Sequence, residues 1–176
     1  MKMHNTEGNR RRIAVVGSSG AGKSTLARKL GQQLELPVLS LDRYYWQPGW
    51  QRPPRQQWRC DQAAMLDAHP SWIADGNYWS TLDLRLHRAD TVIVVDLPRR
   101  VCLARALRRL LQHRGRAIQA PGCPERWSWG FFSYIWSFPT RHRPRLLAAL
   151  NEHADHTRII MLRTRADVRQ FLSGHG

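Results

Sequence analysis

The chain has 176 residues, enough for one α/β domain with a buried core but too few for a second full domain. Its longest apolar runs, such as residues 91–97, are too short to cross a bilayer, and residues 1–12 lack the apolar segment of a secretory signal. Three widely spaced cysteines without a C-x-x-C pair argue against a disulfide framework or a zinc site. We therefore expect a cytoplasmic protein, with a flexible tail at residues 1–9 and a single domain at residues 10–176.

The formal net charge of +15 comes almost entirely from arginine, because the only lysines among the 28 basic residues are Lys2, Lys23 and Lys29. Arginine suits an enzyme that handles phosphate, since its planar guanidinium group binds phosphate oxygens in pairs. A positive surface also attracts nucleic acid by releasing counterions. Arginine can in addition replace lysine through genome base composition. The charge alone leaves these three explanations open.

Short apolar runs that end in turn-forming residues predict the strands of the fold. Residues 13–16 are fully apolar and end at Gly17, as expected of a buried parallel strand. The second run ends at Asp42 and the third at Gly76. Strands are expected at residues 13–16, 37–41, 72–75, 91–96 and 157–162.

Segments with apolar residues at helical spacing separate these runs. Residues 23–34, for example, place Leu26, Ala27, Leu30 and Leu34 on one face. Helices are expected at residues 23–34, 55–68, from 99 to about 113, 143–153 and 166–172. Strands that alternate with helices predict an α/β fold, in which a parallel sheet has helices on both faces.

Two segments follow neither pattern. Residues 43–54 are rich in aromatic residues, proline and glycine, which predicts a structured loop. Residues 114–139 combine Gly115, Pro121 and Gly122 with several aromatic residues. This composition indicates an inserted lid at about residues 114–139.

The pattern G-x-x-x-x-G-K-S lies between the first strand and the first helix, the order that a phosphate-binding loop requires. Its glycines let backbone N–H groups point towards phosphates, and the helix adds the positive end of its dipole. Lys23 is expected to reach the β- and γ-phosphates, and Ser24 to bind Mg²⁺. This Walker A motif predicts ATP as the ligand of Gly17, Ser18, Ser19, Gly20, Ala21, Gly22, Lys23, Ser24 and Thr25.

A second ligand for Mg²⁺ is expected at the end of a neighbouring strand. Asp75 and Asp96 both end apolar runs. The strand beside the phosphate loop is normally the third in this topology, so we expect Asp75 and Ser24 to hold the metal. Because Asp75 precedes Gly76, a turn-forming role is the alternative. Asp96 is interpreted as mainly structural.

Asp42 follows the second strand, at the edge where parallel sheets bind their ligands. A carboxylate that faces a γ-phosphate can accept a proton from an attacking hydroxyl group, or it can orient the acceptor. A helix or turn cap is equally consistent with an aspartate at this position. Asp42 is therefore a candidate catalytic residue with a structural alternative.

Arginines gather after the fourth strand and after the lid. A phosphoryl group in transfer needs cations besides Mg²⁺, although arginines at this spacing also form ordinary solvated helix faces. The helix that starts at residue 99 and its end carry Arg105, Arg108, Arg109 and Arg114, and the residues after the lid add Arg141, Arg143 and Arg145. The predicted catalytic residues are Lys23, Asp42, Arg109, Arg114, Arg141 and Arg143.

Six tryptophans fall into two groups. One group lies close to Asp42 in the sequence and the other in the lid. Such side chains either stack on a bound ligand or fill the core. The two groups are Trp46, Trp50 and Trp58, and Trp127, Trp129 and Trp136.

Beyond these motifs, the chain from about residue 12 to residue 172 resembles the FlaR-type DNA topology modulation proteins, which are similar to adenylate kinases and related P-loop nucleotide kinases. The chain departs from that family at residues 116–120, where the start of the lid is short. The resemblance rests on residues 17–25, 41–46, 48–50, 72–78, 89–93, 96–99, 121–125 and 135–144.

This resemblance implies a P-loop NTPase fold with sheet order 2-3-1-4-5 and a mobile lid. It also implies Mg²⁺-dependent transfer of the γ-phosphate of ATP to a small acceptor, for which a nucleotide or nucleoside is expected. One alternative is an ATP-binding regulatory protein that holds DNA or RNA through its basic surface, and another is an ATPase switch. Weak, non-specific binding to nucleic acid follows from the charge alone. No membrane partner is expected.

Overall fold

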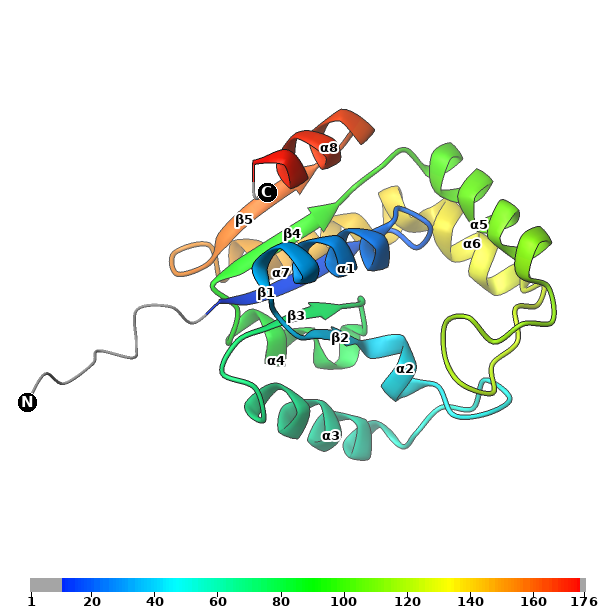
Figure 1. The fold of residues 1–176 in the computed structure, drawn as a ribbon, viewed down its shortest axis with the longest axis horizontal. Coiled ribbons are helices and arrows are strands. Elements are labelled where there is room, and N and C mark those ends of the chain that lie inside the picture. The colour runs from blue at the N-terminus through cyan, green and yellow to red at the C-terminus, as the bar shows by residue number, and fades with distance from the viewer. Residues whose placement is uncertain (1–10, 175–176) are drawn as a thin grey trace, which may run out of the picture.

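A computed structural model describes residues 11–174, so the predicted tail at residues 1–9 lies outside the described part of the chain. Five parallel strands form one sheet in the order β2-β3-β1-β4-β5 (Figure 1). The predicted sheet and its order are thereby confirmed. The strands are β1 (Arg12–Gly17), β2 (Val38–Ser40), β3 (Trp72–Asp75), β4 (Thr91–Val95) and β5 (Arg158–Leu162).

Helices cover both faces of the sheet (Figure 1). The α-helices are α1 (Lys23–Leu34), α2 (Leu41–Tyr45), α3 (Arg55–Asp67), α4 (Leu82–Leu86), α5 (Arg99–His113), α6 (Trp129–Ser137), α7 (Arg143–Asn151) and α8 (Arg165–Ser173). A 3₁₀ turn, η1 (Trp79–Thr81), precedes α4, and a π-helical turn, η2 (Phe138–His142), joins α6 to α7. No helix within residues 11–174 is long and apolar enough to cross a membrane.

The central strand β1 supplies one core to each face of the sheet, because side chains alternate along a strand. Ile13 and Val15 pack with residues of α1, α5 and α6. Ala14 and Val16 pack with residues of α3, α4 and α7. The parallel register sets Gly17 opposite Val95 and Val15 opposite Asp75, so the phosphate loop and Asp75 lie at the same carboxyl edge.

The second strand and the loop after it differ from the prediction. Residues 41–45 form the short helix α2, so Asp42 lies in the first turn of a helix and not at the end of a strand. Leu41 is fully buried, and the Tyr45 ring packs against the rings of Tyr78 and Trp58. These partners are distant in the sequence, which explains why the local composition predicted a loop here.

Residues 114–139 are also more regular than the sequence indicates. Residues 114–128 contain no helix or strand beyond isolated pairing, but residues 129–137 form α6, which packs against α5. Ile135 of α6 is fully buried in the core. We call residues 114–128 the lid loop. Whether residues 114–139 move as a lid stays a prediction.

Candidate active site

The phosphate loop, residues 17–24, turns sharply between β1 and α1. Gly17, Gly20 and Gly22 have φ angles of 131°, 79° and 100°, a region that favours glycine. A Cβ atom on Gly17 would lie 2.2 Å from the carbonyl oxygen of Val95, and one on Gly20 would lie 2.3 Å from that of Cys102. Both glycines are therefore required by the close approach of β4 and α5 to the loop.

Lys23 lies beside the two predicted acidic residues of the site. Its Nζ atom donates a hydrogen bond of 3.0 Å to the carbonyl oxygen of Ser18 within the loop. Burial lowers the pKa of Lys23, while the negative charges of Asp75 and Asp42 oppose that shift. Residues from β3, α2 and the phosphate loop are thus close enough for their charges to act on one another.

Asp75 ends β3 and is 4 % exposed. Its Oδ1 atom has no hydrogen-bond partner among residues 11–174, and the Ser24 side chain is near enough to lower the pKa of the carboxyl group. Burial raises the pKa of Asp75, and the positive charge of Lys23 and the neighbouring Ser24 side chain oppose the shift. A carboxylate and a neighbouring hydroxyl group are the hard oxygen ligands that Mg²⁺ prefers, so the donor set fits this metal.

Asp42 is held from the side by Tyr78. The Tyr78 hydroxyl group donates a hydrogen bond of 2.5 Å to Oδ1 of Asp42. Burial and the neighbouring Asp42 carboxylate both raise the pKa of Tyr78, so this phenol stays protonated and remains a donor. The bond fixes the carboxylate in orientation without engaging Oδ2. The functional and the capping roles of Asp42 both stay predictions.

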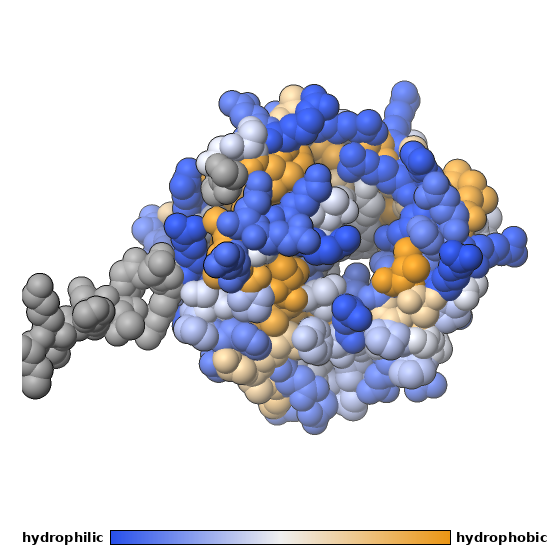
Figure 2. Space-filling model, in the orientation of Figure 1, coloured by the Kyte–Doolittle hydropathy of each residue, from blue (hydrophilic) through white to orange (hydrophobic). Residues whose placement is uncertain are grey.

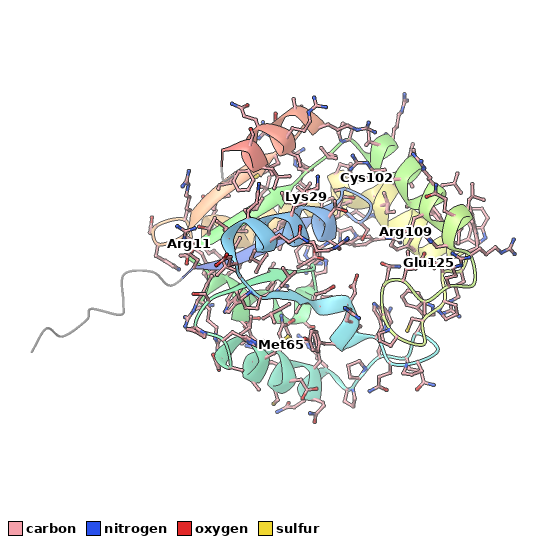
Figure 3. The ribbon with its side chains drawn as sticks, in the orientation of Figure 1. Arg11, Lys29, Met65, Cys102, Arg109 and Glu125 are labelled. Carbon is pink, nitrogen blue, oxygen red and sulfur yellow. The ribbon has the colours of Figure 1, made fainter. Side chains whose placement is uncertain are left out.

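The predicted arginines separate into those that reach the phosphate loop and those that do not. Arg109 lies close enough to Lys23 for its charge to lower the pKa of Lys23. Its Nε atom is 3.4 Å from Oε1 of Glu125, and Figure 3 shows the two side chains near each other. Arg105 donates a hydrogen bond of 2.8 Å to the carbonyl oxygen of Ala21. Both come from α5.

The other predicted arginines lie elsewhere. Arg143 forms an ion pair of 2.9 Å with Asp96, beside a pocket of about 300 Å³ at the ends of β4 and α7. Arg114 and Arg141 are exposed to solvent. Arg109 thus lies near Lys23, while catalytic roles for Arg109, Arg114, Arg141 and Arg143 stay predictions.

Two residues that the sequence interpretation missed hold the site in place. The side-chain amide of Asn77 accepts a hydrogen bond of 3.0 Å from the Gly17 amide and donates one of 2.8 Å to the Gly17 carbonyl group. Asn77 also donates to the Tyr134 hydroxyl group at 2.8 Å. The start of the phosphate loop is therefore bonded to the segment that follows Asp75. An asparagine directly after Asp75-Gly76 was the available signal.

Arg85, the second missed residue, is completely buried in α4. Its guanidinium group donates hydrogen bonds to the carbonyl oxygens of Gly76 and Asn77. Burial lowers the pKa of Arg85 to about 10, against the opposing charge of Asp75. The signal in the sequence was an arginine on the same helical face as Leu82 and Leu86.

The lid loop is attached to the loop after α2. The Gly49 amide donates to the Gly122 carbonyl oxygen at 2.9 Å, and Nε1 of Trp50 donates to that of Pro124 at 2.9 Å. Figure 2 shows the molecule hollowed between the phosphate loop, α2 and the lid loop.

The two tryptophan groups differ in position. Trp58 is buried in the core, whereas Trp46 and Trp50 lie towards the lid loop. Trp127, Trp129 and Trp136 are exposed, and the guanidinium group of Arg99 lies over the Trp136 ring.

No protein-family model matches the chain. An uncharacterized protein of Bacillus subtilis, YqaC, is 25% identical over 147 residues, which cover 82% of each chain. A structure from Chloroflexus aurantiacus, proposed to be a kinase, superposes with a TM-score of 0.57 and 19% identity over 94% of this chain and 96% of the other. A gluconokinase from Sinorhizobium meliloti superposes with a TM-score of 0.54 and 16% identity over 95% of this chain and 93% of the other. A shikimate kinase from Bacteroides thetaiotaomicron superposes with a TM-score of 0.50 and 15% identity over 93% of this chain and 95% of the other. The fold is that of P-loop kinases.

Proposed function

We propose that this protein is an ATP-dependent phosphotransferase that moves the γ-phosphate of ATP to a hydroxyl group of a small acceptor. The single observation that carries the proposal is the convergence of Lys23, Asp75 and Asp42 at the carboxyl edge of the sheet. An ATPase switch needs the first two residues but has no use for a carboxylate held by Tyr78. Catalysis of this kind depends mainly on positioning and on charge stabilisation.

Each side chain has a defined task in this proposal. The loop amides and Lys23 hold the phosphates of ATP, and Arg109 offsets charge that develops during transfer. Ser24 and Asp75 would hold Mg²⁺, which supplies positive charge to the phosphates when bound. Asp42 orients the acceptor hydroxyl group and accepts its proton. The lid loop excludes water from the reacting groups.

The finer expectations belong to the same proposal. They are membership of the FlaR-type proteins, similarity to adenylate kinases, ATP and Mg²⁺ as the cofactors, and a nucleotide or nucleoside as the acceptor. The sheet order and the position of the phosphate loop support them. A cytoplasmic location also remains part of the proposal.

Two substitutions test the function. Lys23→Ala is expected to lower phosphotransfer by ~10²-fold or more, because a fixed cation at the phosphates is lost. Lys29→Ala, on the exposed side of α1, is the matched control. ATP binding by calorimetry, ADP release and thermal melting are measured on both. A folded Lys23→Ala variant with wild-type ATP affinity and turnover contradicts the proposal.

Asp42→Asn separates catalysis from helix capping. As a general base Asp42 is worth ~10²–10⁴ in rate, so turnover should fall while ATP affinity is retained. As a cap it would be worth ~1 kcal/mol of stability, and turnover would persist. Steady-state kinetics and urea denaturation of the same variant distinguish the two roles.

A further inference from the structure

A row of aromatic side chains extends from Asp42 to the lid loop. The Tyr78 hydroxyl group holds Asp42, and the centroid of the Tyr45 ring lies 4.5 Å from that of Tyr78. The Trp46 ring lies 4.9 Å from that of Tyr45 and 5.3 Å from that of Trp50. We call Tyr45, Trp46, Trp50 and Tyr78 the aromatic row. All four side chains are only partly buried, so the row keeps some aromatic surface exposed.

Three acidic groups lie near Lys23 or Arg109, beside the aromatic row. They are Asp42, Asp75 and Glu125. Asp42 and Asp75 both act on the charge of Lys23, and Glu125 faces Arg109, which acts on the same lysine. Glu125 is 5 % exposed, and its Oε1 atom also accepts a hydrogen bond of 2.6 Å from the Gln119 amide. The acceptor side of the site is therefore bordered by negative charge.

Four cations near Lys23, Asp42 or the aromatic row already have partners. Lys23 bonds to the phosphate loop, and its task in the proposed function is to bind ATP. Arg85 is buried and donates to backbone carbonyl groups, while Arg109 is paired with Glu125. Arg52 lies over the Trp46 ring, with its guanidinium carbon 5.6 Å from the ring centroid.

An anionic acceptor fits this arrangement poorly. A phosphate or carboxylate group requires charge-assisted donors, for which arginine is the usual residue. Placed near Asp42, such a group would face like charge, and that repulsion is strong in a site with little water. An uncharged ring system meets no such penalty and gains contact area on the aromatic row.

We propose that the phosphate acceptor is an uncharged small alcohol with a flat apolar face, a class to which nucleosides belong, and not a compound that already carries a phosphate or carboxylate group. This inference rests on the proposed function. The flat face lies on the aromatic row, and the hydroxyl group bonds to Oδ2 of Asp42. The acceptor oxygen forms a bond to the γ-phosphorus, and the bond from that phosphorus to the bridging oxygen of ADP breaks. The acceptor proton passes to Asp42.

Matched ligand pairs test the charge preference directly. The wild-type chain is mixed with Mg²⁺ and a non-hydrolysable ATP analogue and titrated with adenosine or AMP, and with thymidine or its monophosphate. Tryptophan fluorescence reports binding, and ADP release with ATP reports turnover. The uncharged member of at least one pair should bind ~10-fold or more tightly and be phosphorylated faster.

Equal or tighter binding of both monophosphates overturns the inference and leaves the kinase proposal intact. Arg43 follows Asp42 and is exposed on α2, so it is the cation that would serve a phosphate in that case. If Arg43→Ala then lost tight binding of the monophosphate, Arg43 would be identified as the residue that binds the phosphate group. If neither the wild type nor Lys23→Ala binds Mg-ATP, that result contradicts the proposed function itself.

A pair of tryptophan variants tests the aromatic row. Trp46→Leu should raise the acceptor KM roughly tenfold, as expected for loss of one stacking face, with kcat and ATP affinity retained. Trp129→Leu is the control, because Trp129 is 76 % exposed on α6, away from Asp42. An unchanged KM in Trp46→Leu, in a variant that melts like wild type, overturns the role of the row.

Discussion

At the scale of single residues, Asp75 lies where burial disfavours the charged form of its carboxyl group. Burial raises its pKa, so the native state binds a proton more tightly than the unfolded chain does. As pH rises from the ordinary carboxyl range towards neutrality, the native state must give up that proton, and the free energy of unfolding falls. A buried carboxylate of this kind costs stability and suits a metal site.

We therefore expect Asp75→Asn to stabilise the protein at neutral pH while it abolishes Mg²⁺-dependent turnover. A gain of ~1 kcal/mol raises Tm of a domain of this size by roughly 2–4 °C. The gain should shrink as pH falls, because the native carboxyl group then becomes protonated. Melting curves at several pH values, with and without Mg²⁺, measure both effects.

Asp61→Asn is the control for this prediction, since Asp61 is an exposed aspartate on α3. It should leave Tm and turnover close to wild type. A lower Tm in Asp75→Asn at neutral pH would show that Asp75 is held by structural contacts, as a turn-forming residue would be.

At the scale of elements, α4 fixes the segment that follows β3. Arg85 bonds to the carbonyl groups of Gly76 and Asn77, and Asn77 in turn bonds to Gly17. The helix thus holds residues 76 and 77, and through Asn77 it holds the start of the phosphate loop. A buried carbonyl group that loses its donor costs about 1–3 kcal/mol.

Arg85→Met should lower the free energy of unfolding by ~3 kcal/mol and weaken ATP binding, because the Gly76 and Asn77 carbonyl groups lose their donor. Arg88→Met is the matched control, because Arg88 lies just after α4. Arg88 forms a partly exposed ion pair with Asp67, and such pairs are worth ~1 kcal/mol or less. Urea denaturation and calorimetry measure both variants. Equal losses in the two would contradict the assignment.

The lid gives a second prediction at this scale. Hydrogen exchange in the lid loop should slow when an ATP analogue and acceptor are both present, because closure excludes water. Residues 129–137 should be protected in both states, since α6 is helical and contributes Ile135 to the core. The loop after α2 should change together with the lid loop, to which Gly49 and Trp50 are bonded.

Exchange is followed by mass spectrometry on free and doubly liganded protein, with β4 as the internal reference. The same protection of residues 114–128 in both states would show that this segment is not a lid. A change in the lid loop without one in residues 46–51 would show that the two loops move separately.

At the scale of the whole molecule, the charge of +15 makes some attraction to nucleic acid unavoidable. Readout of a sequence needs side chains that a helix or ribbon carries into a groove. The long arginine-bearing helix α5 instead directs Arg105 to the phosphate loop and Arg109 to Glu125. Its inward side serves the proposed nucleotide site.

We therefore expect weak DNA binding that falls steeply with salt, does not depend on sequence and is reduced by Mg-ATP. The measurement is affinity for two unrelated duplexes at several salt concentrations, with and without Mg-ATP. Tight binding at physiological salt that prefers one duplex and ignores ATP would support the nucleic-acid-binding alternative over the kinase.

Much of the fold and the centre of the site follow from local sequence. The phosphate loop was predictable because Gly17, Gly20 and Gly22 meet a backbone requirement that few other residues satisfy. Residues 13–16 of β1 and 92–95 of β4 are continuous apolar runs, a pattern typical of buried parallel strands. The sheet order agreed with the resemblance on which it was based.

The tertiary structure alone decided how the surrounding residues are used. Arg143 pairs with Asp96 and Arg109 approaches Lys23, although both are arginines near the lid in sequence. Helix α2 depends on Tyr45 packing against Tyr78 and Trp58, and Arg85 depends on carbonyl groups of another segment. An unusual backbone conformation can be predicted from the residue that adopts it, because glycine is favoured there. A contact between distant side chains depends on how helices pack on the sheet, and a single sequence does not record that packing.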